Sequence, residues 1–141
     1  MQVQVQLLHP NAKLPARASE GAAGFDLCAV AVDGLAMSDK YLYTYHTGLA
    51  VKVPDGYVGL LFARSSVSKT GAILANCVGV LDPDYRGEIA LKFYHSDEAP
   101  YPEGARVGQL VILPAPAVEF QAVDTLDTTR RGAGGFGSTG T

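Results

Sequence analysis

The amino-acid sequence predicts an all-β protein. Short apolar stretches recur along the chain, and Gly, Pro and Asp interrupt them about every 8 to 12 residues, a spacing typical of β-sandwiches and β-barrels. No window sustains the apolar period of an amphipathic helix over several turns. A chain of 141 residues, 48% of them hydrophobic, is enough for one domain with a sizeable core. We expect a β-domain over residues 1–126 and a flexible glycine-rich lid over residues 127–141.

The individual strands are predicted from alternation, from apolar runs and from turn signals. At the N-terminus, valine and leucine alternate with glutamine, which is the period of two of a half-buried strand. Tyrosines alternate in the same way over residues 41–45, and the turn at residues 54–56 ends another strand. A short helical turn is expected after Ser65. The predicted strands are residues 2–7, 25–32, 41–45, 48–53, 57–62, 73–80, 88–94, 107–113 and 118–123.

The charge, the cysteines and the apolar runs exclude several classes of protein. A net charge of −3 argues against a general nucleic-acid binder, although a few local arginines can still hold a polyanionic small ligand. Cys28 and Cys77 are too few for a disulfide framework and lack the spacing of a zinc site, so we expect both to be small buried hydrophobes. No apolar run approaches the roughly 20 residues that span a bilayer. We therefore expect a cytoplasmic protein in a reducing compartment, without a nucleic-acid or membrane partner.

Two polar positions beside predicted strands suit a phosphate group. Arg64, Ser65 and Ser66 follow the strand 57–62, and a guanidinium fork and hydroxyls together bind phosphate oxygens. Asp26 follows a glycine and a phenylalanine at the start of an apolar strand. The simpler alternatives are a solvated loop arginine and a turn aspartate.

A carboxylate stands directly after an apolar run in the segment 79–89. Asp82 follows residues 78–81, and an ionised side chain at that point needs water or a partner. A plain β-hairpin accounts for the proline and glycine of the segment but not for Asp82. This aspartate is therefore a candidate catalytic base.

The end of the chain combines glycines, one aromatic residue and an arginine. Glycines in residues 131–140 allow backbone amides to approach phosphate oxygens closely, and Phe136 offers a face to a base. The segment lacks the Gly-Lys-Ser/Thr ending of a Walker loop, and the simpler alternative is an unpacked tail. Together, the phosphate donors, the candidate base and a lid predict a nucleotide pocket without naming the nucleotide.

These stretches, in this order, resemble the five motifs of the trimeric dUTPase family, from Gly21 to Gly140. The most specific matches are residues 81–88 and 131–140, and Asn76 also fits the family. The resemblance implies a jelly-roll-like β-barrel that forms a homotrimer, with active sites shared among the chains and the C-terminal tail exchanged over a neighbouring site. It implies Mg²⁺-assisted hydrolysis of dUTP to dUMP and pyrophosphate, which lowers dUTP and supplies dUMP for thymidylate synthesis.

The resemblance also implies a role for each site residue. Asp82 would be the general base that activates the water attacking the α-phosphate, and Tyr85 would lie against the deoxyribose. The substrate phosphates would hold Mg²⁺, and Asp26 would reach it only through water. The uracil pocket would comprise Asn76, Gly79, Val80, Leu81 and Ala90; the phosphate site Arg64, Ser65, Ser66 and Gln109; and the tail Arg131, Phe136, Gly137 and Ser138.

Two positions depart from the family pattern, and three other functions compete with the one it implies. Ala105 stands where an acidic residue is usual, and Ala63 stands where proline is usual. A dCTP deaminase shares the fold, but no stretch here resembles its glutamate-centred site. A nucleotide-switched regulatory binder that has lost catalysis should have lost Asp82 or the tail motif. A purely structural jelly-roll module leaves the tail motif unexplained.

Overall fold

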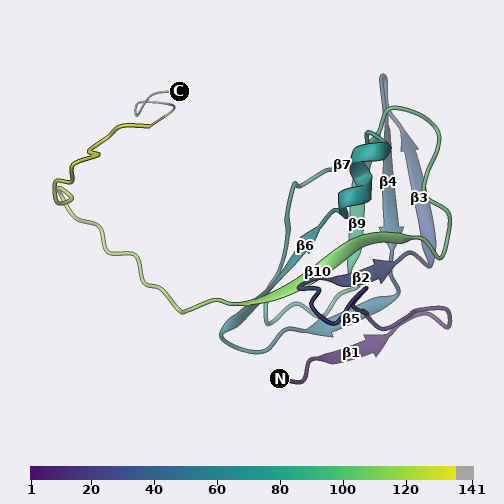
Figure 1. Ribbon diagram of the computed structural model, residues 1–141, viewed down its shortest axis with the longest axis horizontal. Coiled ribbons are helices and arrows are strands. Elements are labelled where there is room, and N and C mark those ends of the chain that lie inside the picture. Colours follow the sequence, from purple (N-terminus) through teal and green to yellow (C-terminus); the bar gives the residue numbers. More distant parts are fainter. Residues whose placement is uncertain (136–141) are drawn as a thin grey trace.

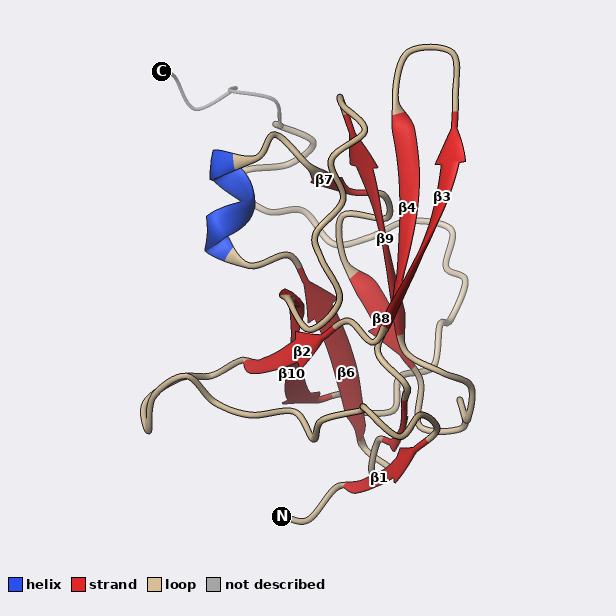
Figure 2. Ribbon diagram, turned by 90° about the vertical axis from the view of Figure 1, so that its right-hand side faces the viewer, coloured by secondary structure: helices blue, strands red, loops and turns tan. Residues whose placement is uncertain are grey.

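The computed structural model describes residues 1–135, and their strands form three antiparallel sheets (Figure 1). This confirms the all-β prediction. A 3-10 helix, η1 (Ser65–Lys69), lies where a helical turn is expected (Figure 2). Within residues 1–135, no helix is long or apolar enough to cross a membrane.

The first sheet pairs β1 (Gln4–Leu7) with β5 (Leu49–Lys52). The second has the order β2 (Phe25–Cys28), β10 (Arg106–Pro114), β6 (Tyr57–Phe62), β8 (Gly79–Leu81). The third has the order β3 (Ala31–Ala36), β4 (Tyr41–His46), β9 (Ala90–His95), β7 (Ile73–Leu74).

All three sheets contribute to one hydrophobic core. Leu27 and Leu110 come from the second sheet, and Tyr45 and Phe93 come from the third. The hydroxyl group of Tyr45 is buried but paired, since it lies 3.1 Å from the His95 Nε2 atom and accepts a bond from the Tyr101 amide. Burial raises the pKa of Tyr45 to about 12, so the hydroxyl stays neutral. Among the described residues, no buried side-chain polar atom lacks a partner.

Two predicted strands are each divided between two sheets. The run 25–32 splits into β2 and β3, because the Ala29 amide bonds the Ala105 carbonyl while the Val30 amide bonds the His46 carbonyl. The run 73–80 splits into β7 and β8 in the same way. Continuous apolar sequence predicts burial, but it does not show at which residue a chain leaves one sheet for another.

Two further predictions are wrong. Residues 118–123 form no strand: the chain after β10 runs away from the sheets as an extended segment, and Phe120 is 99% exposed (Figure 1). An extended segment becomes a strand only when another strand supplies its hydrogen bonds. The cysteines are not both buried. Cys28 is half-buried at the end of an edge strand, and Cys77 is exposed in the crossing between β7 and β8.

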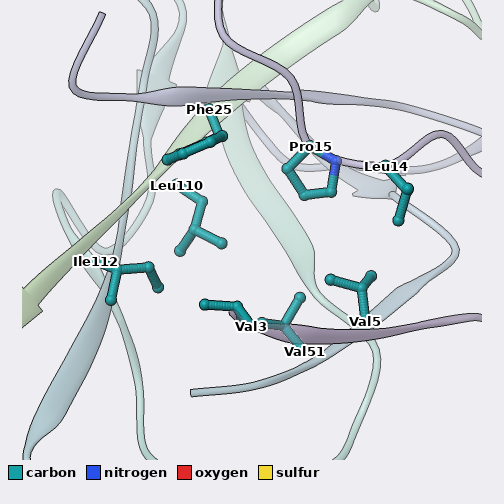
Figure 3. A pocket seen from close by; sticks show the side chains of 8 residues that line it. All are labelled: Val3, Val5, Leu14, Pro15, Phe25, Val51, Leu110 and Ile112. Atoms are coloured by element: carbon teal, nitrogen blue, oxygen red, sulfur yellow. The ribbon is translucent and has the colours of Figure 1, made fainter. Parts of the chain in front are cut away.

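An apolar cavity of about 240 Å³ lies between the small β1–β5 sheet and strands β2 and β10 (Figure 3). Its lining offers no polar side chain to a ligand, so it belongs to the packing between sheets. The lining residues are Val3, Val5, Leu14, Pro15, Phe25, Val51, Leu110 and Ile112.

Candidate active site

The register of β10 assembles the predicted phosphate-binding residues. Gln109 lies opposite Asp26 on β2 and opposite Phe62 on β6. Side chains alternate along a strand, so Gln109 and Asp26 share the outer face of the sheet while Leu110 points into the core. Strand β6 then ends, and its continuation carries Arg64 into the start of η1.

Direct contacts join Arg64, Ser66 and Arg106 around Asp26. Ser65 follows Arg64 in the chain, and Gln109 pairs with Asp26 across the sheet. We call these six residues the anion-binding cluster. The Nε atom of Arg64 donates to Asp26 Oδ1 at 2.9 Å, and its Nη1 atom lies 3.4 Å from the Ser66 hydroxyl. The Gln109 amide donates to the Ala63 carbonyl at 3.1 Å. The alanine at position 63 therefore still supplies the main-chain acceptor that orients Gln109.

A β-bulge brings Arg106 into the cluster. The pairing of β10 with β2 shifts between Arg106 and Gly108, so that Val107 is an extra residue and is buried. The extra residue inverts the alternation and turns Arg106 to the outer face. There its Nη1 atom donates to Asp26 Oδ2 at 3.0 Å. The contact of Arg106 with Asp26 was not predicted, because a bulge cannot be read from apolar periodicity.

The electrostatics of the cluster favour an anion. The Asp26 carboxylate is only 15% exposed and is shared by two guanidinium groups, each of which remains accessible to solvent. One negative charge against two positive charges leaves the cluster with a net positive charge. A Cβ atom at Gly24 would meet the side-chain oxygen of Gln109, so glycine at this position leaves Gln109 room in its present orientation.

A second cluster surrounds a cavity of about 340 Å³ beside the edge strand β8. Asn76, Gly79 and Ala90 line it, as predicted for a base pocket. Val80 is 59% exposed and Leu81 is 6% exposed, with the Leu81 side chain in the core. Leu81 can therefore present only main-chain groups. The full lining is Leu61, Leu74, Ala75, Asn76, Gly79, Ala90, Leu91 and Lys92.

The turn after β8 carries Asp82 and Tyr85. The Tyr85 amide donates to the Asp82 carbonyl at 3.2 Å, and the Tyr85 hydroxyl donates to the Glu88 carbonyl at 3.0 Å. A Cβ atom on Gly87 would overlap the Tyr85 ring, so the ring lies directly on the backbone at residue 87. The Asp82 carboxylate is exposed and has no hydrogen bond or ion pair within residues 1–135, which leaves it free to accept a proton.

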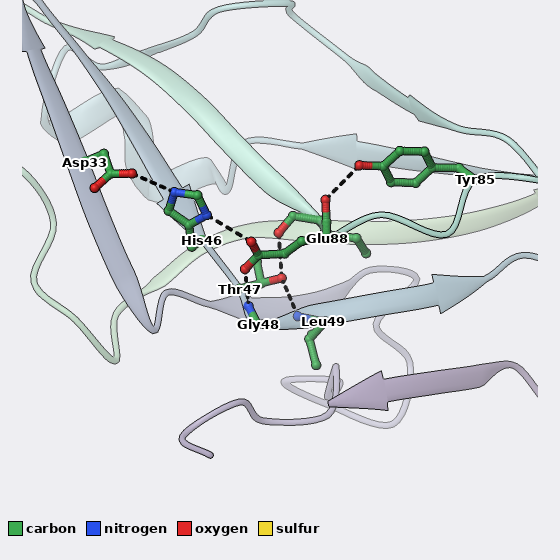
Figure 4. Close-up of polar contacts among 8 residues, drawn as sticks. Asp33, His46, Thr47, Gly48, Leu49, Tyr85 and Glu88 are labelled. Atoms are coloured by element: carbon green, nitrogen blue, oxygen red, sulfur yellow. Dashed lines mark hydrogen bonds and ion pairs between the residues drawn. The ribbon is translucent and has the colours of Figure 1, made fainter. Parts of the chain in front are cut away.

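A polar network behind this turn was not predicted from the sequence (Figure 4). His46 lies between Glu88, at 3.0 Å from Nδ1, and Asp33, at 2.9 Å from Nε2. The hydrogen bond that His46 donates to Glu88 raises the pKa of His46 above its ordinary value, and partial burial opposes this rise. The residues are 42 and 13 positions apart from His46, so no local spacing signals the contact.

Residues 127–135 lie apart from both clusters in the single chain (Figure 1). The side-chain bond of Arg131 among the described residues is local, from its Nε atom to the Gly134 carbonyl at 2.8 Å. The predicted contacts of Phe136, Gly137 and Ser138 lie outside the described residues. The anion-binding cluster and the cavity lie on opposite faces of the second sheet, because Gln109 is on the outer face with Asp26, whereas Leu61, which lines the cavity, is buried and pairs with Leu110.

Known proteins share both the sequence and the fold. The sequence model of the dUTPase family matches residues 10–140. The chain belongs to the dUTPase family. A deoxyuridine 5'-triphosphate nucleotidohydrolase of Desulfitobacterium hafniense is 46% identical over 132 residues, covering 91% of this chain and 87% of that protein.

Solved dUTPase structures superpose on most of the chain. The dUTPase of Staphylococcus bacteriophage 80alpha, determined with dUpNHpp, is 28% identical, covers 99% of both chains and has a TM-score of 0.83. A mutant dUTPase of phage phi11 of S. aureus, described as coordinating a structural Mg(II) ion, is 27% identical with a TM-score of 0.74 and covers 89% of this chain and 98% of that one.

The side chains of this dUTPase family member fit a magnesium ion that is held mainly by a bound ligand rather than by the protein. Among residues 1–135, no three acidic, histidine or cysteine side chains gather into a metal site. Asp26 is the one carboxylate of the anion-binding cluster, and each of its oxygens keeps a lone pair beyond its arginine bond. Such a carboxylate can accept a bond from a water molecule on an ion, but it cannot by itself form an octahedral cage.

Asp26→Asn should lower the free energy of unfolding by about 1–2 kcal/mol, because it removes the charge that two guanidinium groups share. Urea unfolding at fixed protein concentration measures this change. Asp55→Asn is the matched control, since Asp55 is an exposed turn carboxylate without an ion pair in the described part of the chain. It should change the free energy by less than about 0.5 kcal/mol. Equal losses in the two variants would contradict a stabilising role for the Asp26 ion pairs.

Proposed function

We propose that this protein is a dUTP diphosphatase, which hydrolyses dUTP to dUMP and pyrophosphate and so lowers dUTP and supplies dUMP for thymidylate synthesis. Membership in the dUTPase family supports this. The structural observation that carries the proposal is the segment 76–90, which leads from the β7–β8 crossing to β9; β8 and β9 belong to different sheets, so it is not the hairpin expected from the family resemblance. It combines a cavity of nucleobase size with the exposed, unpartnered carboxylate of Asp82.

The segment 76–90 would bind uracil mainly through its backbone. Asn76 and the main chain at Val80, Leu81 and Ala90 border or adjoin the cavity, and Gly79 has no side chain to fill it. Main-chain amides and carbonyls can match the donor–acceptor edge of uracil. Cytosine presents the opposite groups and would leave buried partners unpaired, which is a costly mismatch. The 5-methyl group of thymine would collide with backbone.

Asp82 and Tyr85 would act on the sugar and on the attacking water. The Tyr85 ring, held over Gly87, would lie against the deoxyribose and exclude a 2'-hydroxyl group by contact. Asp82 would accept a proton from a water molecule as its oxygen bonds the α-phosphorus. The bond from the α-phosphorus to the bridging oxygen breaks, and that oxygen leaves with pyrophosphate. Asp82 would also accept a bond from the 3'-hydroxyl group.

The anion-binding cluster would hold the triphosphate. Arg64, Ser65, Ser66 and Gln109 supply donors on one face of the sheet, with Ser65 nearest the α–β bridge, where negative charge grows as the bond breaks. The phosphates would hold Mg²⁺, and Asp26 would reach it through water. Bound there, the ion supplies positive charge that neutralises the triphosphate.

Each complete site would be shared among the three chains of a jelly-roll-like, barrel-forming homotrimer. The placement of the two parts supports this, because Arg64 turns toward Asp26 on the outer face of the second sheet, whereas the cavity lies where Leu61, Gly79 and Leu91 meet. A neighbouring chain would place its segment 76–90 against the anion-binding cluster. A third would deliver the tail, with Phe136 stacked on uracil. Arg131, Gly137 and Ser138 of that tail would bind the γ-phosphate.

The deciding experiment is release of pyrophosphate from dUTP, with dTTP, dCTP and UTP in parallel and with Mg²⁺ present or chelated. We expect release from dUTP alone, dependent on Mg²⁺. Release of ammonia from dCTP would instead identify a deaminase. No reaction with any nucleotide, from a folded protein, would contradict the proposed enzyme and favour a nucleotide-dependent binding protein.

Asp82→Asn should lower kcat for dUTP at least about 100-fold, because the amide cannot accept the proton of the attacking water. Steady-state pyrophosphate release measures the effect, and dUMP binding should persist. Asp84→Asn is the matched control, since Asp84 is an exposed carboxylate in the same turn. Near-wild-type turnover by the Asp82 variant would remove this residue from its proposed role.

Two inactive variants should restore activity to each other when their chains are mixed. Arg64→Ala disables the anion-binding cluster, and Asp82→Asn disables the segment 76–90. A mixed assembly can therefore combine the two intact parts. After joint unfolding and refolding of equal amounts, roughly a quarter of the sites should be complete if two chains supply the two parts. Each variant refolded alone is the control. No recovery from the mixture would place both parts in one chain.

A further inference from the structure

A polar chain connects the β3–β4 hairpin to the turn that carries Tyr85 (Figure 4). His46 on β4 contacts Asp33 on β3 and Glu88 at the start of the segment leading into β9. The other carboxylate oxygen of Glu88 accepts the Gly48 amide at 2.7 Å. The Glu88 main-chain carbonyl accepts the Tyr85 hydroxyl at 3.0 Å. One residue, Glu88, is thus fixed by its side chain and in turn fixes Tyr85 by its backbone.

The geometry requires His46 to be doubly protonated when both contacts are made. Ionised carboxylates only accept hydrogen bonds, and each ring nitrogen of His46 faces a carboxylate oxygen within 3.0 Å. A neutral imidazole has a single N–H group and can satisfy only one of them. The strand neighbours of His46, Ala31 and Ala90, are uncharged, so Asp33 and Glu88 are the charged groups that face it in the described chain.

The two carboxylates are not equally constrained. Asp33 is 79% exposed, so water can replace its bond to His46 readily. Glu88 is less exposed and is also held by Gly48. When His46 loses its proton, the bond to Asp33 is therefore the one released. The remaining bond to Glu88 then loses its cationic donor and weakens.

The backbone next to Glu88 has anchors of its own. The Ile89 amide bonds the Leu49 carbonyl at 2.7 Å, and the Ile89 carbonyl accepts both the amide and the hydroxyl group of Thr47. Loss of the Glu88 side-chain contacts would therefore leave the segment folded. It would release the peptide groups at Gly87 and Glu88, on which Tyr85 rests.

We propose that His46 and Glu88 are positioning residues that hold Tyr85 in place and thereby set the selectivity for deoxyribose over ribose. The proposal rests on the proposed function, since Tyr85 is the residue that would contact the sugar. Neither His46 nor Glu88 belongs to the cavity lining or to the anion-binding cluster, although His46 pairs across the sheet with Ala90 of that lining. Their effect would be transmitted through the position of one aromatic ring and its hydroxyl group.

The kinetic test compares kcat/KM for dUTP with kcat/KM for UTP. In His46→Ala this ratio should fall roughly tenfold, with kcat for dUTP within about twofold, because a displaced Tyr85 ring would pack less closely on deoxyribose and exclude a 2'-hydroxyl group less strictly. His9→Ala is the control, since His9 bonds only a neighbouring amide in the described residues. Glu88→Gln, which keeps the side-chain volume, repeats the test if the alanine variant does not fold. An unchanged ratio in a folded variant would overturn the proposal.

A test by NMR does not depend on catalysis. In ¹⁵N-labelled wild-type protein, both ring nitrogens of His46 should carry a proton below its pKa, and contact with Glu88 and Asp33 should raise that pKa above the value of a free imidazole. The amide signals of Tyr85 and Gly87 should follow that titration and should lose it in His46→Ala. The stabilisation from His46 should be complete below pH 6.5 and lost as pH rises through the raised pKa.

The two measurements separate the proposal from the proposed function. If the wild-type protein leaves dUTP intact but the Tyr85 and Gly87 signals follow His46, the function fails and the positioning link stands. If dUTP is hydrolysed but these signals ignore His46, the positioning link is overturned.

Discussion

The register of β10 is the constraint on which the anion-binding cluster depends. Strand β10 pairs with β2 on one side and β6 on the other, so its register sets Asp26 and the exit toward Arg64 together. A slip of one residue would turn Gln109 into the core and expose Leu110. Burial of Leu110 therefore stabilises the position of the polar residue beside it. The bulge at Val107 adds Arg106 to the same face without disturbing the pairing that follows.

The cavity of about 340 Å³ beside β8 depends on a strand that is short and lies at the edge of its sheet. Strand β8 covers only Gly79–Leu81 and pairs with β6 alone in the described structure. Its second edge keeps main-chain donors and acceptors that no strand there uses, and an edge of this kind pairs readily with another hydrogen-bonding group. Because Leu81 anchors the strand in the core, the available backbone is held rigidly. A planar base docked against it would be read without flexible side chains.

The sequence was sufficient for elements whose signals are local. Strand β10 was predicted at 107–113 and runs from Arg106 to Pro114, because apolar residues and flanking turns mark it clearly. The divided runs, the bulge and the His46–Glu88 contact were missed, since each depends on which strands pair far along the chain. Of the site, the cavity lining agrees with residues that the family resemblance supplied, whereas residue spacing alone suggested only phosphate donors and one carboxylate. The segment 118–123 has the apolar pattern of a strand, but a single chain provides no partner for it.

The separation of Asp82 from the arginines of the anion-binding cluster bears on whether Asp82 can act as a base. A guanidinium paired with Asp82 would occupy the lone pairs that a general base needs, and the described chain places none there. Arg64 and Arg106 are instead bound to Asp26 on the far edge of the sheet, while Arg86, in the same turn as Asp82, bonds main-chain carbonyls. The described chain thus keeps the proposed proton acceptor apart from the charges proposed to bind phosphate. Assembly of chains would then bring them to a triphosphate from two sides, with the base still free to act.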